Sequence, residues 1–174
     1  ISMGLRFGTF SITLTLIPIV VGSALYGWGS GAWLGFVFGV TVLLTGDANL
    51  FLAVNIPGTI ITVILKGTLA GAAAGFVYKL ISKKNQIAAV IVSAVVAPVV
   101  NTGIFVLGSY VFFFDYLSGL AEGTNLFVFI LVGLVGINFF IELGINLVLN
   151  PAILQIIRIG KKNFGGKNQI IKTK

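Results

Sequence analysis

Apolar positions fill most of this chain in long stretches, and one of the longest is NLFVFILVGLVGINFFIELGINLVLNP, residues 125–151. About 20 consecutive apolar residues cross a bilayer as a helix, so this stretch is long enough to cross with some tilt. Asn138, Glu142 and Asn146 interrupt it at intervals of four residues, which places them on one face of a helix. Inserting an acidic side chain at mid-membrane costs about 3 kcal/mol, and such a side chain normally faces the inside of a helix bundle. We therefore expect other helices to cover the face that carries these three polar residues.

The same pattern predicts four more membrane spans, separated by short segments that contain Gly, Pro, Asn or charged residues. Pro18 falls in the middle of the first span and predicts a kink there. The second span is short for a full crossing. The prediction is an all-α fold, a polytopic membrane helix bundle with five spans at residues 9–26, 31–45, 58–81, 87–114 and 125–151.

Glycine recurs every fourth residue in two of these spans, at 31, 35 and 39 and again at 67, 71 and 75. Ridges of small residues let a second helix approach closely. We expect packing inside the bundle, with contact to a partner subunit as the alternative. The segment 46–57 between these spans mixes polar and apolar residues, and we expect a structured loop at the membrane surface.

Composition supports a membrane protein, because 57% of the 174 residues are hydrophobic and only 9% are charged. A soluble domain carries about 25% charged residues. The chain has no Cys and no His, which removes thiol redox chemistry, Cys/His metal sites and catalysis by either side chain. The four acids are far apart in sequence and form no predicted pair. We therefore expect no enzymatic activity, catalytic residue, metal or cofactor.

The net charge of +7 is concentrated beside the apolar spans, at residues 79–84 and 158–174. Under the positive-inside rule both clusters are cytoplasmic, which favours contact with the lipid bilayer rather than with nucleic acid. Residues 1–158 are then the transmembrane bundle and 159–174 a basic cytoplasmic tail. Counting back places Ile1 outside the cell, and a start without Met there predicts a sixth span upstream in the native protein.

Polar residues at matching depths predict a binding site inside the bundle. At about 1.5 Å per helical residue, Lys66, Asn101 and Asn138 lie at similar depth from the outer side, with Glu142 about one turn deeper. Amides both donate and accept hydrogen bonds, and a lysine can meet a carboxylate. This arrangement favours a small polar ligand that enters from outside.

Structural roles are open for the same residues. Lys66 and Glu142 can neutralise each other, because buried charges are usually paired. Asn101 can satisfy a carbonyl freed by the proline three residues earlier. Asn55 and Thr59 flank a proline helix start, where Asn55 can cap the helix. The candidate substrate-binding residues are Lys66, Asn101, Asn138, Glu142, Asn55 and Thr59.

Three segments resemble the substrate-binding S components of energy-coupling factor (ECF) vitamin transporters. They are ITLTLIPIVVGSALYGWGSGAWLGFVFG (12–39), LLTGDANLFLAVNIPGTIITVILKGTLAGAAAGFVYKLISKKN (43–85) and VVAPVVNTGIFVLG (95–108). The resemblance extends over residues 9–157. The GDA loop together with APVVNTGIF is most similar to the pantothenate-specific members.

This resemblance implies six helices, a vitamin site near the outer side and no ATP binding in this subunit. It also implies a bacterial cell membrane and assembly with a membrane coupling (T) subunit and two cytoplasmic ATPase subunits. The family's first helix carries an Ala-x-x-x-Ala contact for the coupling subunit, and no residues here correspond to it. Three other functions stay open: an S component for another water-soluble vitamin, an ion-coupled carrier that relays protons through Glu142, and a purely structural membrane subunit.

Overall fold

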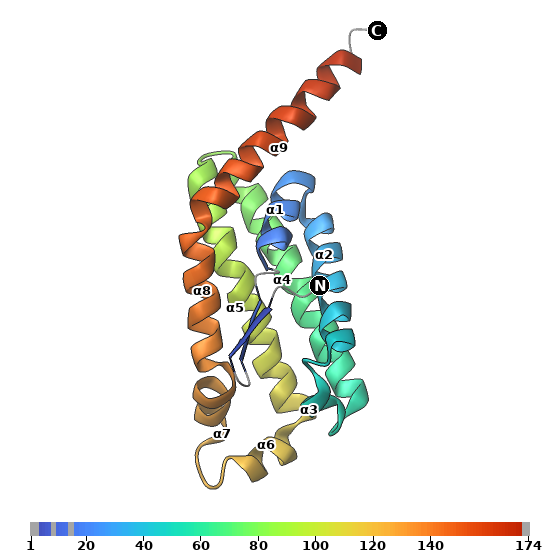
Figure 1. Cartoon of the computed structure of the whole chain (residues 1–174), viewed down its shortest axis with the longest axis vertical. Coiled ribbons are helices and arrows are strands. Elements are labelled where there is room, and N and C mark those ends of the chain that lie inside the picture. Colours follow the sequence, from blue (N-terminus) through green and yellow to red (C-terminus); the bar gives the residue numbers. More distant parts are fainter. Residues whose placement is uncertain (1–3, 8–9, 14–15, 172–174) are drawn as a thin grey trace.

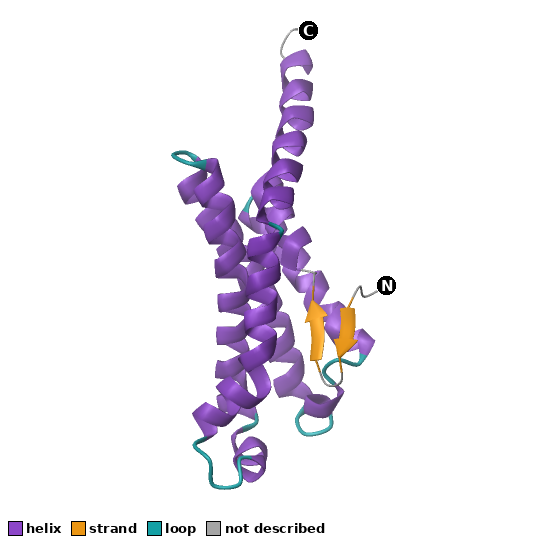
Figure 2. Cartoon of the chain, turned by 60° about the vertical axis from the view of Figure 1, so that its left-hand side comes forward, coloured by secondary structure: helices purple, strands orange, loops and turns teal. Residues whose placement is uncertain are grey.

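The computed structural model describes residues 4–7, 10–13 and 16–171, with side chains from Leu16 onward except at 137–138, 161 and 163–171. Within these residues the chain forms a bundle of long helices, with a short β-hairpin beside it and one helix that projects from one end (Figures 1 and 2). The predicted all-α bundle is therefore largely helical but includes two strands.

The first predicted span is corrected by this hairpin. β1 (Gly4–Phe7) pairs antiparallel with β2 (Phe10–Thr13), and the helix α1 (Leu16–Tyr26) begins only afterwards. Aromatic and β-branched residues alternate with polar ones in Phe-Ser-Ile-Thr, which suits a strand. The 11 residues of α1 extend about 16 Å, too short to cross a bilayer. Pro18 lies in the first turn of α1, where a missing N–H is tolerated, and not at a mid-span kink.

Three helices are long and apolar enough to cross a membrane: α2 (Trp28–Thr45), α4 (Ile56–Ser82) and α5 (Gln86–Phe112). Their bounds lie within three residues of the predicted ones. The short helix α3 (Asn49–Leu52) lies in the loop between α2 and α4, as expected for a structured loop. Asn85 caps α5, since its side chain accepts a hydrogen bond from the Ala88 N–H at 3.0 Å.

The fifth predicted span is broken rather than continuous. It consists of α7 (Leu126–Val128), the π-helix η1 (Phe129–Gly136) and α8 (Ile137–Val148), with a 43° bend between the parts before and after residues 137–138. Counted as one broken crossing, it brings the candidate spans in the described chain to four, so the predicted five are not confirmed. α9 (Asn150–Ile171) follows and runs across residue 158 without a break.

The two glycine ridges pack against each other. An added Cβ at Gly35 would overlap the carbonyl oxygen of Gly67, and one at Gly31 would overlap that of Gly71. A Cβ at Gly39 would lie 2.9 Å from the carbonyl oxygen of Val63. The ridges thus form the α2–α4 interface, as expected for packing inside the bundle.

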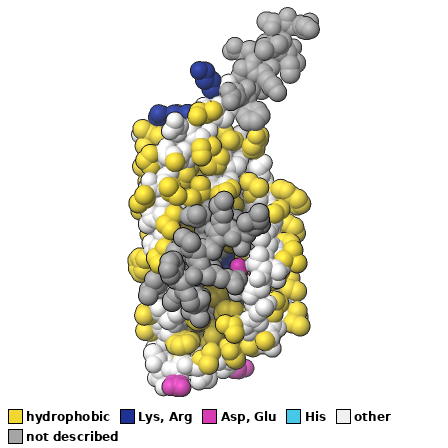
Figure 3. Space-filling model, viewed as in Figure 1, with side chains coloured by type: hydrophobic (Ala, Val, Ile, Leu, Met, Phe, Trp, Pro, Cys, Tyr) yellow, Lys and Arg dark blue, Asp and Glu magenta, His cyan; other side chains and the backbone are white. Residues whose placement is uncertain are grey.

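Most charged side chains that Figure 3 shows lie at the two ends of the molecule, Lys and Arg at one and Asp and Glu at the other, and one acidic side chain lies near mid-height. Lys79, Lys83 and Lys84 lie where α4 meets α5, and α9 leaves the bundle at the same end (Figure 1). Asp115 lies at the opposite end, in α6 (Phe114–Leu120). Leu, Ile, Val and Phe side chains remain exposed along the sides of the bundle, which is typical of a surface that faces lipid.

Candidate functional site

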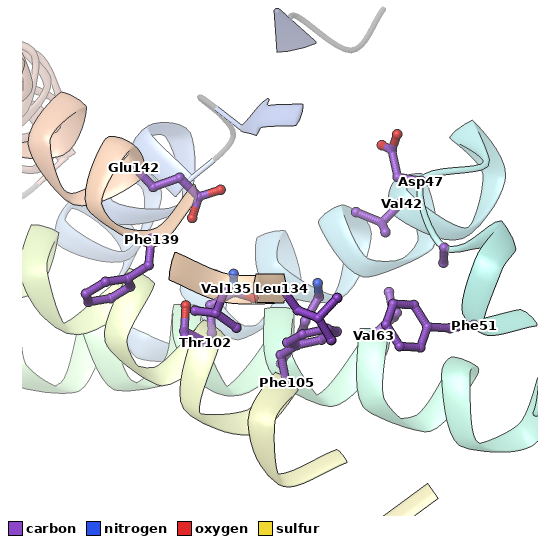
Figure 4. A pocket seen from close by; sticks show the side chains of 13 residues that line it. Val42, Asp47, Phe51, Val63, Thr102, Phe105, Leu134, Val135, Phe139 and Glu142 are labelled. Atoms are coloured by element: carbon purple, nitrogen blue, oxygen red, sulfur yellow. The ribbon is translucent and has the colours of Figure 1, made fainter. Parts of the chain in front are cut away.

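A cavity of about 210 Å³ lies inside the bundle, on the side of α4 that faces α5 and α8 (Figure 4). Its volume is roughly seven times the share of one water molecule in the liquid, which is enough for a small organic ligand. Its walls come from α2, the loop with α3, α4, α5, η1 and α8. The lining residues are Val42, Asp47, Ala48, Phe51, Val63, Lys66, Asn101, Thr102, Phe105, Leu134, Val135, Phe139 and Glu142.

Lys66 supplies the positive charge of the cavity. Its side chain is half-buried, and its Nζ lies 5.3 Å from the centre of the Phe105 ring. This distance is within the range of a cation–π contact, which holds the ammonium group without using its three N–H donors. The carboxylates of Glu142 and Asp47 both interact electrostatically with this ammonium group.

Asn101 contributes a polar atom that has no partner in the described part of the chain. The side chain is 9% exposed, and its Oδ1 makes no hydrogen bond there. A buried acceptor left without a donor costs about 1–3 kcal/mol, so such atoms usually meet a ligand or water. Because Asn101 lines the cavity, a ligand that donates a hydrogen bond would remove this cost.

The two acids lie on opposite sides of the cavity. Figure 4 shows Glu142, on α8, at one side and Asp47, in the turn after α2, at the other, with Leu134 and Val135 between them. Asp47 Oδ2 accepts a hydrogen bond from the Thr45 hydroxyl at 2.9 Å. The lining therefore carries two carboxylates and one ammonium group.

The aromatic rings of Phe51 and Phe105 line the cavity. Phe51, on α3, makes edge contacts with Phe105 and Phe113 at centroid distances of 5.5 and 5.0 Å. These contacts tie the α2–α4 loop to α5. The loop is therefore part of the cavity wall and not a free connection.

The structure brings together three of the six predicted site residues. Lys66, Asn101 and Glu142 line one cavity, whereas Asn55 and Thr59 do not line it. Asn55 caps α4, accepting from the Gly58 N–H at 2.9 Å, and the Thr59 hydroxyl donates to the Asn55 carbonyl oxygen at 2.7 Å. The side chain of Asn138 lies outside the described residues.

Several residues that line the cavity are not among the predicted site residues. Phe105 follows Asn101 by four residues, so helical spacing could have placed it on the same face. Asp47 and Phe51 lie in a loop, where no periodicity indicates direction. Nothing in the sequence distinguishes Thr102 or Phe139 from the residues around them as part of a binding site.

A family model described as ECF transporter, substrate-specific component, matches residues 1–154 of the 174-residue chain. The matched region contains every residue that lines the cavity. Comparison with curated proteins and with solved structures finds no match.

Proposed function

Since the chain belongs to the substrate-specific components of ECF transporters, we propose that its cavity binds a water-soluble vitamin, with pantothenate as the substrate. Membership in the family makes the chain a membrane transporter subunit that binds a small molecule and works with an ECF module. We further propose that this module comprises a membrane coupling subunit and two cytoplasmic ATPase subunits. The C-terminal helix then lies on the cytoplasmic side of a bacterial membrane.

The observation that carries this proposal is that the buried Asn101 Oδ1, which has no hydrogen-bond partner among the described residues, lines the same cavity as Lys66. Pantothenate has one carboxylate, two hydroxyls and an amide. Lys66 would hold the carboxylate, and Asn101 would accept a hydrogen bond from a hydroxyl or from the amide N–H. Glu142 would accept from the second hydroxyl.

Native mass spectrometry of the full chain, purified without added ligand, tests the proposal directly. We expect one small molecule per chain, with the mass of pantothenate after release. A different vitamin would keep the transporter assignment and replace the substrate. An empty protein that also fails to bind a panel of vitamins in calorimetry would contradict both the vitamin-binding function and pantothenate as the substrate. It would favour a purely structural subunit.

The Glu142→Gln variant distinguishes an anionic vitamin from a cationic one, because it removes one negative charge and keeps a hydrogen-bonding group. For an anionic ligand such as pantothenate, we expect the affinity to stay within a few-fold or to rise, since repulsion falls. For a cationic vitamin, the affinity should fall at least tenfold, about 1.4 kcal/mol. Calorimetry with each ligand gives the answer.

An ion-coupled carrier makes a different prediction for the same variant. It would take up substrate in liposomes that contain this chain alone, and Glu142→Gln would abolish that uptake. An S component should give no net uptake without its module. Accumulation by the isolated chain would therefore contradict the proposal.

A further inference from the structure

A second hollow, separate from the polar cavity, runs along α4 and is bordered by Trp28 of α2 and Val100 of α5. Its volume is about 620 Å³. Ala72 and Ala73 form its floor, Trp28 and Phe76 stand beside them, and Lys79 lies at its end. Trp28 and Phe76 are each 55% exposed, so both rings project beyond the alanine floor. Small side chains between large aromatic ones explain the hollow, which we call the α4 groove.

The α4 groove has the length of one lipid leaflet. Its lining extends along α4 from Leu69 to Lys79. Ten helical residues rise about 15 Å, which is half of a hydrocarbon core of about 30 Å. Lys79 is exposed in the last turn of α4 and is followed by Lys83 and Lys84. One end of the groove thus lies near mid-membrane, and the other at the basic surface.

Charge distinguishes this groove from another apolar hollow of the bundle. None of the four acids of the chain lines the α4 groove, so Lys79 is the charged residue of its lining. A larger hollow of about 790 Å³ between α5 and the η1–α8 segment has no charged residue in its lining. Neutral acyl chains suit both hollows, but only the α4 groove complements an anionic headgroup.

We propose that the α4 groove binds an anionic phospholipid from the leaflet at the basic end of the bundle. One acyl chain lies over Ala72 and Ala73 between the rings of Trp28 and Phe76. The phosphate group lies at Lys79, the charged residue of the groove lining. A juxtamembrane cation is attracted to an anionic membrane surface, and the shaped groove adds packing of the acyl chain.

The placement of the two tryptophans provides a test on the full chain. Trp28 lines the groove, whereas Trp33 does not line it and stacks on Phe36 at 5.6 Å. In a Trp33→Phe variant, Trp28 is the sole tryptophan. The variant is reconstituted in phosphatidylcholine vesicles that contain a small fraction of either phosphatidylglycerol or phosphatidylcholine with brominated acyl chains, which quench nearby tryptophan.

At equal mole fraction, we expect brominated phosphatidylglycerol to quench Trp28 at least threefold more than brominated phosphatidylcholine. Adding Lys79→Ala should remove this preference, and the matched control Lys84→Ala should keep it. Ala73→Leu, which fills the floor, should reduce quenching by both lipids. None of these readouts depends on the vitamin.

Three results would overturn the proposal. Equal quenching by the two lipids would mean that the groove holds no specific lipid. Equal loss in the Lys79→Ala and Lys84→Ala variants would mean that only diffuse surface charge attracts the lipid. No quenching by either lipid would mean that the groove is covered by protein, as for a docking surface between chains.

Discussion

The two sides of α4 differ in how closely the neighbouring helices approach. Toward α2, Gly67 and Gly71 face glycines, and the two backbones are in contact. Toward α5 and α8, Val63 and Lys66 border a cavity of about 210 Å³. Because one helix serves both sides, the close contact fixes the position of Lys66 while the open side leaves room for a ligand. Stability and binding should therefore respond to different substitutions.

Gly35→Leu should have the largest effect, and the effect should be on stability. The new side chain would collide with the backbone of Gly67, which cannot move aside as a flexible side chain does. We expect a loss of about 3 kcal/mol, at the upper end for overpacking. Thermal unfolding in detergent measures it. Gly144→Ala, on α8 with no atom near an added Cβ, is the control and should change stability by less than about 1 kcal/mol.

Lys66→Met should have the next largest effect, but on binding and not on stability. It removes the charge that would hold the vitamin carboxylate and keeps a side chain of similar length. We expect the affinity to fall about 30-fold, or 2 kcal/mol, and the midpoint of thermal unfolding to stay the same or rise. Calorimetry and thermal unfolding of the same sample test both halves. Lost stability without lost affinity would assign Lys66 to structure alone.

Asn101→Ala should have the smallest of the three effects. The ligand would lose one hydrogen bond, and we expect a tenfold weaker affinity, about 1.4 kcal/mol. The free protein should not be destabilised by a lost hydrogen bond, because Oδ1 has no partner in the described chain. An unchanged affinity would remove Asn101 from the proposed site.

The central helices could be predicted from sequence, because long apolar runs and asparagine caps define them. Asn55 and Asn85 begin α4 and α5, and both accept a hydrogen bond from the third residue beyond them. The first and last predicted spans differ from the structure for a physical reason. Hydropathy measures transfer into lipid, so it does not separate a strand such as Phe10–Thr13 from a helix, nor a π-helix from an α-helix.

The lining of the cavity could be predicted in part, because depth along a helix follows from counting residues. Lys66, Asn101 and Glu142 line one cavity, as their depths indicated. Asn55 and Thr59 lie at the start of α4 and hydrogen-bond to its first turn, so their polar side chains serve the helix end and do not line the cavity. Asp47 and Phe51 line the cavity because of the path of the loop between α2 and α4, and helical periodicity does not predict the path of a loop.

The separation of charge along the bundle limits how the molecule can reorient in a membrane. Five cations of the described chain are exposed: Lys79, Lys83, Lys84, Arg158 and Lys162. The first three lie where α4 meets α5, at one end of the bundle. Each cation moved to the centre of the hydrocarbon costs about 3 kcal/mol, so moving several costs on the order of 10 kcal/mol. Such a barrier slows spontaneous inversion by about 10⁷-fold relative to a bundle without these charges. A motion that carries the cavity from one face of the membrane to the other should therefore be faster when a partner surface shelters these charges.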